Sequence, residues 1–501
     1  MKSRIKALDK YAKLAIIVII IGILIRFSLA SMYHVSGDAC WHLSSARYMA
    51  DNLKIPLYEP LGRNQPFWSP PVFHIISAAF YAIFGIFFGT NAAAFGMKLV
   101  SPVFGSLSLV ISYLILKKLF DGKVALYGLL FITFLPMSID YSIFSYADST
   151  LTFFAVASLY LALKNRIILS AIMLSLAILT KYTGLLVIPA TIYIIFIKNK
   201  GTYLKKCMIA LGMAMIISLP WYVRNWIYLN NPFYPILNSL FGGVEAGVTY
   251  SGFNFSNLLS INSIIIPFLE FFGVPDGNPS NIFFFEMGYL PILLAIWLVA
   301  IVAFFFPITM GLRLKKEARN IALLLLVPFL LTAILHILNV GWSVGRRLLP
   351  IVIILAFFWA NGIDLAERRM KYEKAKKIMW AILAVIILGF IFTSFVKINL
   401  ARGQWGLYQD DFNWARQNTE KGSVFMAGGQ CLSYNLGRFA YQPSLTNMDN
   451  VDYVWVNRDF RLDPSSILNT EEIMKLESKE KDLVYENTGT GTRIYRIKRQ
   501  R

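Results

Sequence analysis

The stretch LAIIVIIIGILIRFSLASM, residues 14–32, decides the fold class of this chain. Arg26 is its one charged residue, and a helix of about 20 apolar residues crosses the hydrocarbon core of a bilayer. A cleavable signal peptide has a shorter apolar region that ends in small residues, and neither Arg26 nor His34 suits a cleavage site. The stretch therefore predicts a first membrane helix that is retained.

The composition extends this conclusion to the whole chain. The 501 residues are 57% hydrophobic and 15% charged, with a mean hydropathy of +0.57, as in integral membrane proteins. The net charge is +20, but Lys and Arg stand in short clusters between apolar runs. That pattern is typical of cytoplasmic loops and argues against nucleic-acid binding. Cys40, Cys207 and Cys431 are widely spaced and predict neither a zinc site nor a disulfide framework.

Twelve apolar runs are long enough to be considered as membrane crossings. They are residues 14–33, 70–88, 98–116, 124–142, 147–163, 167–180, 183–197, 207–229, 289–310, 320–338, 347–363 and 378–396. The positive-inside rule tests this count, because short cytoplasmic loops are enriched in Lys and Arg. Five short loops between these runs are basic: 117–123, 164–166, 198–206, 313–319 and 368–377, with 19 Lys and Arg together.

The charge distribution decides the placement of segment 70–88. With the N-terminus inside, all five basic loops lie outside if this segment crosses, and all five lie inside if it does not. We therefore expect it to lie at the outer interface, where Ser69-Pro70-Pro71 before it and the nearby Gly85 and Gly89 suit a short helix.

The predicted fold is a polytopic α-helical membrane protein with about eleven crossings. Its multi-pass domain spans residues 1–397, with a first outer loop at about 34–97. Residues 398–501 form an extracytoplasmic α/β domain, with strand-like runs at 423–427, 451–456 and 492–497. The short crossings 167–180 and 183–197 meet at the outer face, around the sequence Lys-Tyr-Thr-Gly that begins at residue 181.

Several polar residues collect on the predicted outer face. They are His34, Asp38, His42, Arg47, Glu59 and Arg63 in the first loop, then Asp140, Asp148, Lys181, Arg224, Arg346 and Arg347. Cations at outer helix ends depart from the positive-inside rule and need another reason. Isolated cations facing acidic loops suit a phosphate-bearing substrate, with carboxylates left for a metal or a proton.

Each of these residues also has a purely structural interpretation. Asp38 and Asp148 suit helix N-caps, and Lys181 suits snorkelling from a short helix. Arg224 and Arg346 suit anchors to lipid headgroups. Lone histidines on apolar segments, His74 and His336, are expected to be structural, and His42 is more often a hydrogen-bonding residue than a metal ligand. The agreement of these residues on one face favours a functional site.

The pattern resembles the GT-C membrane glycosyltransferases, in the branch of protein O-mannosyltransferases and lipid A aminoarabinose transferases. Shared features are an acidic residue soon after helix one (Asp38), a Pro-containing turn before an interfacial helix (residues 65–71), and a second acidic residue (Asp148). The Lys-aromatic-x-Gly element at Lys181, the stretch 220–235 and the Arg-Arg-Leu-Leu-Pro turn at 346–350 are also similar. The resemblance spans roughly residues 15–365.

Two departures leave the subfamily open. O-mannosyltransferases tend to carry an Asp-Glu pair where this chain has Asp38-Ala39. Aminoarabinose transferases have a Lys before the Pro turn, where this chain has Gln65. The first departure weakens a protein-mannosylation interpretation, and the second removes one expected contact to the donor phosphate.

The resemblance implies inverting transfer of a sugar from a polyisoprenyl (dolichyl or undecaprenyl) phosphate donor to an extracytoplasmic glycan, protein or lipid. Asp38 is the expected base, and Lys181, Arg224, Arg346 and Arg63 are expected to bind the donor phosphate. Asp148, His42 and Glu59 either orient the acceptor or bind a metal. A divalent metal ion, where present, is expected on Asp38, Asp148 and His42. The expected location is the plasma membrane, with the N-terminus cytoplasmic.

The rival interpretation is a transporter or flippase of a phosphorylated polyprenyl lipid. Transporters usually show internal repeats and charges near the middle of the membrane. The charged residues here lie at the predicted outer edge, and no repeat is visible in the sequence. Sugar transfer is therefore the favoured prediction.

Overall fold

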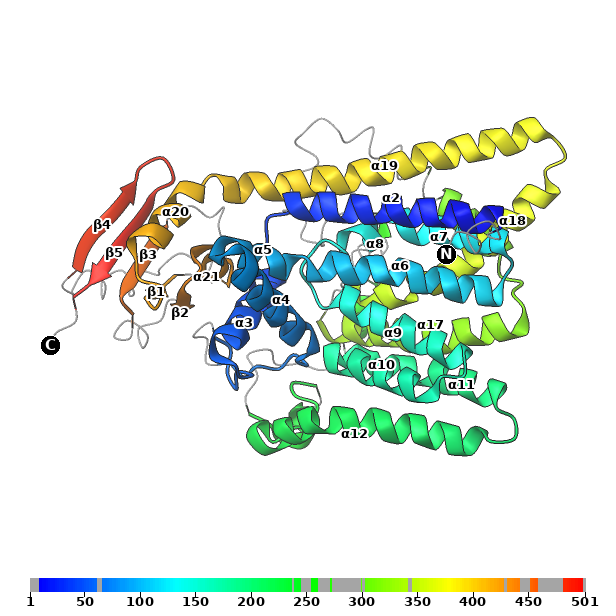
Figure 1. Ribbon diagram of the computed structural model, residues 1–501, viewed down its shortest axis with the longest axis horizontal. Helices are drawn as coiled ribbons and strands as arrows, with labels where there is room; N and C mark the ends of the chain where they lie inside the picture. The colour runs from blue at the N-terminus through cyan, green and yellow to red at the C-terminus, as the bar shows by residue number, and fades with distance from the viewer. Residues whose placement is uncertain are drawn as a thin grey trace.

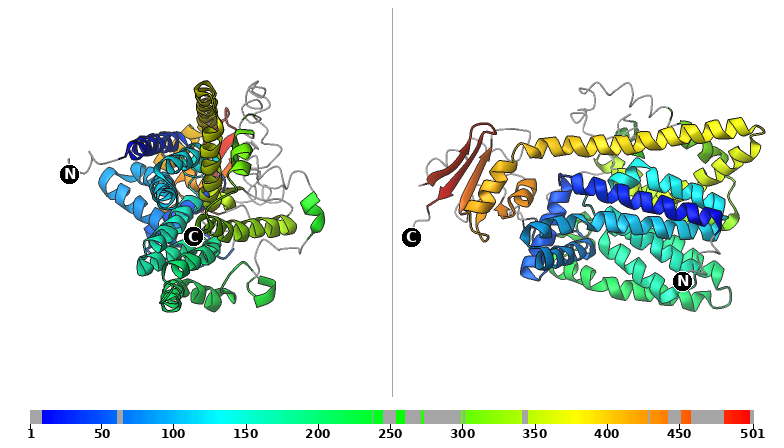
Figure 2. Two further views of the ribbon diagram at one scale, coloured as in Figure 1. Left: turned by 90° about the vertical axis from the view of Figure 1, so that its right-hand side faces the viewer. Right: turned by 45° about the horizontal axis from the view of Figure 1, so that its top comes forward.

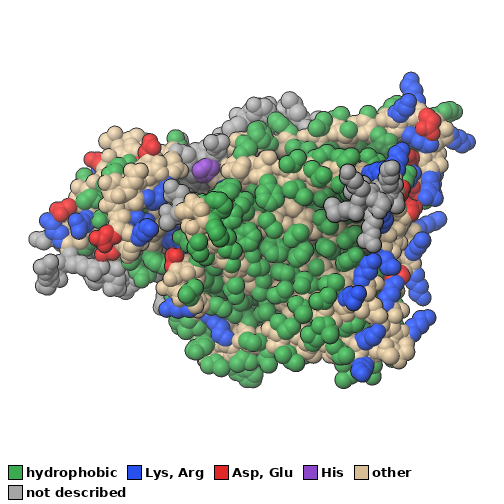
Figure 3. All heavy atoms as spheres, viewed as in Figure 1, with side chains coloured by type: hydrophobic (Ala, Val, Ile, Leu, Met, Phe, Trp, Pro, Cys, Tyr) green, Lys and Arg blue, Asp and Glu red, His purple; other side chains and the backbone are tan. Residues whose placement is uncertain are grey.

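The computed structural model is an elongated helical bundle with a small sheet domain at one end (Figure 1). It describes residues 9–60, 65–236, 238–244, 254–259, 271–272, 299, 302–340, 345–427, 430–441, 451–457 and 481–498. We call the end of the bundle next to the sheet the domain end and the opposite end the basic end. Lys and Arg side chains gather at the basic end, beyond a broad apolar surface (Figure 3).

Six helices in the described part of the chain are long and apolar enough to cross a membrane. They are α2 (Lys10–Met32), α6 (Val100–Leu119, preceded by the end of α5), α12 (Tyr203–Leu229), α17 (Lys316–Val340), α18 (Val352–Arg369, preceded by η4) and α19 (Glu373–Gly406). Shorter apolar helices complete the bundle: α7 (Gly122–Phe134), α9 (Asp148–Leu163), α10 (Ile167–Thr180) and α11 (Ile188–Lys198). Ten of the eleven predicted crossings thus have a helix, and the eleventh, 289–310, lies largely outside the described residues.

One predicted crossing is interrupted. The run 124–142 was expected as one helix, but α7 ends at Phe134 and a short helix, α8 (Pro136–Asp140), follows. Leu135 between them is extended, with φ −62° and ψ 126°. Proline lacks the N–H that would continue the helix and disfavours a helical residue before it. The interruption directs the chain across the domain end before α9 begins.

Segment 70–88 forms α4 (Val72–Phe88), which is not one of the bundle's long spans. It lies at the domain end, where it packs against α3 (Asp38–Asn52) and α5 (Thr90–Lys98), as the views from two directions show (Figures 1 and 2). Gly89, with φ 84°, ends the helix and turns the chain into α5. The interfacial helix predicted from the charge count is therefore present.

The turn between α10 and α11 is tightly packed. A 3-10 helix, η1 (Tyr182–Val187), connects the two short helices and follows Lys181 directly. A Cβ atom at Gly184 would lie 2.5 Å from the backbone carbon of Ala177, closer than real side chains approach backbone. Only glycine lets η1 fold back onto α10, and this close approach fixes the position of Lys181.

In its described residues, the C-terminal domain has a five-stranded sheet with the order β2-β1-β3-β5-β4. Its elements are α20 (Gln409–Asn418), β1 (Val424–Met426), α21 (Gln430–Leu436), β2 (Phe439–Tyr441), β3 (Tyr453–Asn457), β4 (Lys481–Asn487) and β5 (Thr492–Ile497). Both partners of β1 run parallel to it, whereas β5 is antiparallel to β3 and β4. Trp455 on β3 is fully buried and stacks on Phe412 of α20, with ring centroids 5.4 Å apart.

All three strands predicted from the sequence are present, as β1, β3 and β5. The sequence did not indicate β2, which has three residues, or β4, whose KDLVYEN sequence is largely polar. The predicted domain boundary at 397 falls inside α19, which extends to Gly406. The boundary itself stays a prediction.

A disulfide bond joins Cys40 on α3 to Cys431 on α21, across 391 residues of sequence. Nearby, Arg47 Nη2 on α3 donates a hydrogen bond to the Arg438 carbonyl at 2.9 Å. The expectation that the cysteines form no disulfide was wrong. Spacing along the sequence cannot reveal a pair that becomes adjacent only when the C-terminal domain packs on the first loop.

We predict that the unreduced, denatured protein has one reactive thiol and the reduced protein three. The single thiol is Cys207, the free cysteine in the structure, because Cys40 and Cys431 are bonded to each other. Maleimide labelling followed by intact-mass measurement counts the thiols. The variant Cys207→Ser should react with maleimide only after reduction. The variant Cys431→Ser should show two reactive thiols without reduction. Labelling of all three thiols in the unreduced wild-type protein would contradict the pairing.

Candidate functional site

Two carboxylate–cation pairs lie at the domain end of the bundle. Arg346 Nη2 is 2.5 Å from Asp38 Oδ2, and Lys181 Nζ is 2.6 Å from Asp148 Oδ1. The two pairs are close enough for the charge of Asp148 to act on Arg346 as well. Four residues predicted for the site, separated by up to 308 positions in the sequence, are thus brought together. We call these four residues the charge cluster.

Each member of the charge cluster lies at an end of a helix. Asp38 is in the first turn of α3, and Asp148 is the first residue of α9. Lys181 follows the last residue of α10, and Arg346 belongs to the 3-10 helix η4 (Gly345–Ile351) that precedes α18. Neither carboxylate makes a side-chain capping hydrogen bond, so the capping interpretation of both residues is not supported.

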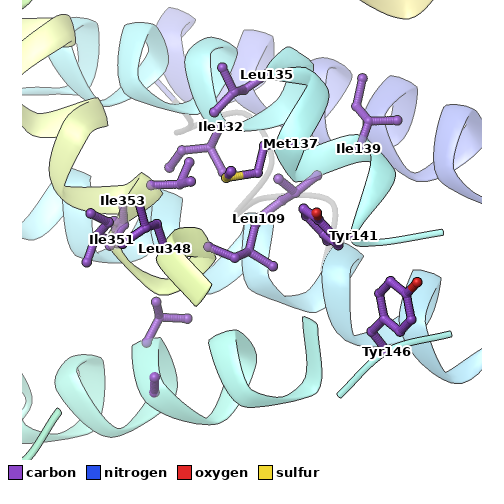
Figure 4. Close-up of a cluster of buried hydrophobic side chains, with 14 of the residues drawn as sticks. Leu109, Ile132, Leu135, Met137, Ile139, Tyr141, Tyr146, Leu348, Ile351 and Ile353 are labelled. Carbon is purple, nitrogen blue, oxygen red and sulfur yellow. The ribbon is translucent and has the colours of Figure 1, made fainter. Parts of the chain in front are cut away.

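A buried apolar cluster supports the segments that carry these charges (Figure 4). Leu348 and Ile351 of η4 pack in the same core as Leu109 of α6 and Ile132 of α7. Tyr146 lies at the edge of this cluster, and the Arg346 guanidinium carbon is 4.6 Å from the centre of its ring. A cation over an aromatic face is attracted by the ring, so Tyr146 helps to hold Arg346 in place.

Exposure separates the roles of the two carboxylates. The side chain of Asp38 is 55% exposed, whereas that of Asp148 is 3% exposed. Of the two carboxylate oxygens of Asp38, only Oδ2 has a hydrogen-bond partner among the described residues. Oδ1 is therefore left accessible. Asp38 can therefore reach a substrate, while Asp148 is placed to fix Lys181.

Two histidines lie beside the charge cluster. His42 Nδ1 is 2.9 Å from His74 Nε2, and the His42 ring is near the ring of Tyr146. The pKa of His42 is held well below its ordinary value, mainly by burial. The neighbouring His74, Arg346 and Lys181 lower it further. Burial lowers the pKa of His74 to about 3. Both imidazoles are therefore neutral, and His74, expected as a lone structural residue, is a partner of His42.

Asp140 has a different environment from the charge cluster. It is buried at the end of α8, where Lys397 Nζ lies 3.0 Å from its Oδ2 and Ser394 donates a hydrogen bond to its Oδ1. Both partners belong to α19. This pair attaches the long helix that leads to the C-terminal domain to the turn that precedes α9.

Arg224, a predicted phosphate ligand, contacts the first loop. Its guanidinium donates to the carbonyls of Pro56 at 2.8 Å and Phe67 at 3.3 Å, and lies 4.7 Å from the centre of the Trp221 ring. Its contacts thus attach α12 to the loop. A role in binding phosphate stays a prediction.

Of the remaining predicted first-loop residues, the structure describes Glu59. Glu59 is buried in the loop. The pKa of Tyr234 is raised mainly by the burial of that tyrosine and secondly by the charge of Glu59. Arg63 lies outside the described residues.

The predicted metal ligands do not form a metal site. Among the described residues, no group of three or more His, Cys, Asp and Glu side chains could hold a metal ion. Asp38 and Asp148 are each paired with a cation, and His42 is bonded to His74. The three residues therefore do not form a three-ligand group; binding of a divalent metal stays a prediction, and we derive no chemical step through one.

Three features of the site could not be recognised in the sequence. Tyr146 is one of many aromatic residues, and only its place two positions before Asp148 distinguishes it. His74 stands alone on an apolar segment, and Cys40 and Cys431 are far apart. Each becomes part of the site through a contact between segments distant in the sequence, which no local pattern encodes.

Comparison with known protein families agrees with this geometry. Residues 68–227 match the family model described as dolichyl-phosphate-mannose-protein mannosyltransferase. The matched region includes Asp148, Lys181 and Arg224, and ends before Arg346. A comparison with curated protein sequences finds no match.

Solved structures share the fold along nearly the whole chain. ArnT from Cupriavidus metallidurans bound to undecaprenyl phosphate has a TM-score of 0.63 at 11% identity, covering 96% of this chain and 97% of that one. The archaeal oligosaccharyltransferase AglB from Archaeoglobus fulgidus, in complex with an inhibitory peptide and a dolichol-phosphate, has a TM-score of 0.51 at 13% identity, covering 97% and 74%. The mycobacterial arabinofuranosyltransferase AftD has a TM-score of 0.54 at 13% identity, covering 98% and 40%.

The chain therefore has the GT-C fold, with interfacial helices at the domain end and a small C-terminal sheet domain. The resemblance predicted from the sequence is confirmed at this level.

We predict that Asp148→Asn destabilises the protein by about 3 kcal/mol, because removing one partner of a buried ion pair leaves the other charge without compensation. The double variant Asp148→Asn, Lys181→Met should recover part of the stability that Asp148→Asn loses. The matched control is Glu373→Gln, which breaks the exposed Glu373–Lys376 pair and should cost less than about 1 kcal/mol. Thermal unfolding in detergent measures all four proteins. Equal midpoints for Asp148→Asn and the control would contradict the structural importance of the pair.

Proposed function

We propose that this protein is a membrane glycosyltransferase that moves a sugar from a polyisoprenyl-phosphate donor to an acceptor at the outer face of the membrane. The observation that carries the proposal is the charge cluster: an accessible carboxylate, Asp38, is paired with Arg346, next to the Lys181–Asp148 pair, at one end of a GT-C bundle. A carboxylate can accept the acceptor's proton, and cations can stabilise a departing phosphate.

The domain end is proposed to face outward. Lys and Arg gather at the opposite end (Figure 3), as expected for cytoplasmic loops. The disulfide between Cys40 and Cys431 supports the same orientation independently, because disulfides persist mainly in oxidising compartments outside the cytosol. In a prokaryotic cell, the proposed orientation corresponds to a site on the outer side of the plasma membrane.

The proposed reaction is a single displacement with inversion at the anomeric carbon. The acceptor oxygen bonds to this carbon as the bond to the donor phosphate oxygen breaks, and the electron pair of that bond leaves with the prenyl phosphate. The acceptor's proton passes to Asp38. Lys181 and Arg346 stabilise the charge that develops on the phosphate, and Asp148 keeps Lys181 in position. Arg224 and Arg63 stay candidates for further contacts with the donor.

The donor class is proposed from the relatives. One structure with this fold holds undecaprenyl phosphate and another a dolichol-phosphate, and the matching family model names dolichyl-phosphate-mannose. A donor with a prenyl tail must be met at the membrane interface, where the charge cluster is placed at the end of apolar helices. Hexose and pentose donors, and glycan, protein and lipid acceptors, all fit this proposal.

We predict that Asp38→Asn lowers transfer by at least about 10³-fold, within the range for loss of a general base, while the protein stays folded and membrane-inserted. Release of prenyl phosphate from labelled polyprenyl-phosphate sugars, offered with candidate acceptors, measures the rate. Asp51→Asn is the matched control, because Asp51 is exposed on the same helix, and it should retain wild-type activity. Wild-type turnover in Asp38→Asn would exclude the base role.

We predict opposite accessibility for two single cysteines introduced at exposed sites. In a Cys207→Ser background, Lys54→Cys after α3 should react with a membrane-impermeant maleimide in intact cells, and Asn165→Cys between α9 and α10 should not. Both should react after the membrane is permeabilised. Labelling of Asn165→Cys alone in intact cells would reverse the orientation and remove the site from the outer face.

A further inference from the structure

The helix α3 presents two groups of residues on opposite sides. At about 100° per residue, Asp38 and His42 lie within about 40° of each other, and Cys40 and Arg47 within about 20° of each other on the far side. Cys40 contacts the C-terminal domain through the disulfide, and Arg47 contacts it through the Arg438 carbonyl. On the other side of the helix, Asp38 is paired with Arg346, and His42 contacts His74. Asp38 and His42 are therefore neighbours on the face that forms the site.

The contacts of His74 determine which tautomer His42 adopts. Nδ1 of His74 is buried without an ordinary hydrogen bond, and the backbone of Pro70, one helical turn earlier, acts on the His74 ring as an acceptor that raises its pKa, against the larger effect of burial. Because Nε2 faces His42, we infer that Nδ1 is the nitrogen that faces the Pro70 carbonyl. A carbonyl only accepts hydrogen bonds, so the proton of neutral His74 belongs on Nδ1. Its Nε2 then accepts from Nδ1 of His42 at 2.9 Å. The opposite arrangement would bury a lone pair of His74 against the carbonyl oxygen.

This arrangement leaves the other nitrogen of His42, Nε2, as a hydrogen-bond acceptor. Among the described residues, Nε2 has no hydrogen-bond partner, and it is accessible although the residue is half-buried. A positively charged imidazole would suit phosphate. Burial first, and then the neighbouring His74, Arg346 and Lys181, instead hold the pKa of His42 low, so that Nε2 offers a lone pair. A lone pair beside an accessible carboxylate suits hydroxyl groups.

We propose that His42 Nε2 accepts a hydrogen bond from a hydroxyl adjacent to the one that Asp38 deprotonates, so that the acceptor is a saccharide or a similar polyol. The inference rests on the proposed transferase function and narrows its acceptor class. A single hydroxyl, as on a Ser or Thr side chain, would satisfy Asp38 and leave His42 without a partner. His74 acts as a positioning residue, because it fixes the tautomer of His42.

The test uses the full-length protein in nanodiscs with labelled polyprenyl phosphates that carry mannose, glucose or arabinose. The acceptor probes are octyl mannoside, its monodeoxy analogues and a serine-containing peptide. KM is measured separately for donor and acceptor. The matched variants are His42→Asn, whose amide replaces Nδ1, and His42→Gln, whose amide reaches the position of Nε2. His74→Leu and His74→Gln form a second pair, because only Gln can still accept from His42.

For the wild-type protein, we expect octyl mannoside to be preferred over the peptide, and one monodeoxy analogue to raise the acceptor KM about tenfold. That factor corresponds to one neutral hydrogen bond, about 1.4 kcal/mol. His42→Asn and His74→Leu should raise the KM for octyl mannoside about tenfold and abolish the discrimination against that analogue. His42→Gln and His74→Gln should both retain this discrimination. The donor KM should stay unchanged in all four variants.

Other outcomes separate this inference from the proposed function. Preference for the peptide, or undiminished discrimination between octyl mannoside and its analogues in His42→Asn, would overturn the inference while transfer itself stands. An equal rise of donor and acceptor KM in His42→Asn would indicate only a structural role and would also overturn it. Failure of the wild-type protein to release prenyl phosphate from any donor would overturn the proposed function, and this inference with it.

Discussion

The domain end of this protein depends on the pairing of carboxylates with cations. A charge removed from water needs an opposite charge and hydrogen bonds beside it, or its burial is strongly unfavourable. Asp148, with 3% of its side chain exposed, has Lys181 within 2.6 Å. Arg346 pairs with Asp38 and lies over Tyr146. These contacts hold together four segments that begin or end separate helices, and they leave one carboxylate accessible.

The same kind of pairing also connects the bundle to the C-terminal domain. Asp140 binds Ser394 and Lys397 of α19, the helix that leads into the domain. The disulfide between Cys40 and Cys431 attaches the domain a second time, directly to α3. Because α3 carries Asp38 on its other side, the position of this carboxylate is fixed by the bundle and by the domain together.

The sequence predicts the parts of this structure that follow local rules. Apolar length identified the helices, the distribution of Lys and Arg removed segment 70–88 from the crossings, and alternation identified three of the five strands. Asp38, Asp148, Lys181 and Arg346 were recognised because charges at predicted outer helix ends are unfavourable without a function. The break at Pro136, the disulfide and the His42–His74 pair were missed. The first depends on one residue within a long apolar run, and the other two depend on contacts between distant segments.

The first loop shows why the fold leaves the substrate class open. Backbone hydrogen bonds join Glu59 to Gln65 and Leu57 to Phe67, and Arg224 holds the loop through the carbonyls of Pro56 and Phe67. Contacts to backbone do not depend on which side chains the loop carries. Gln65, where aminoarabinose transferases have Lys, can therefore change the chemistry of the loop without moving it. Side chains such as Gln65 and His42 are therefore the candidates for substrate selection, because the backbone contacts that hold the loop do not distinguish between substrates.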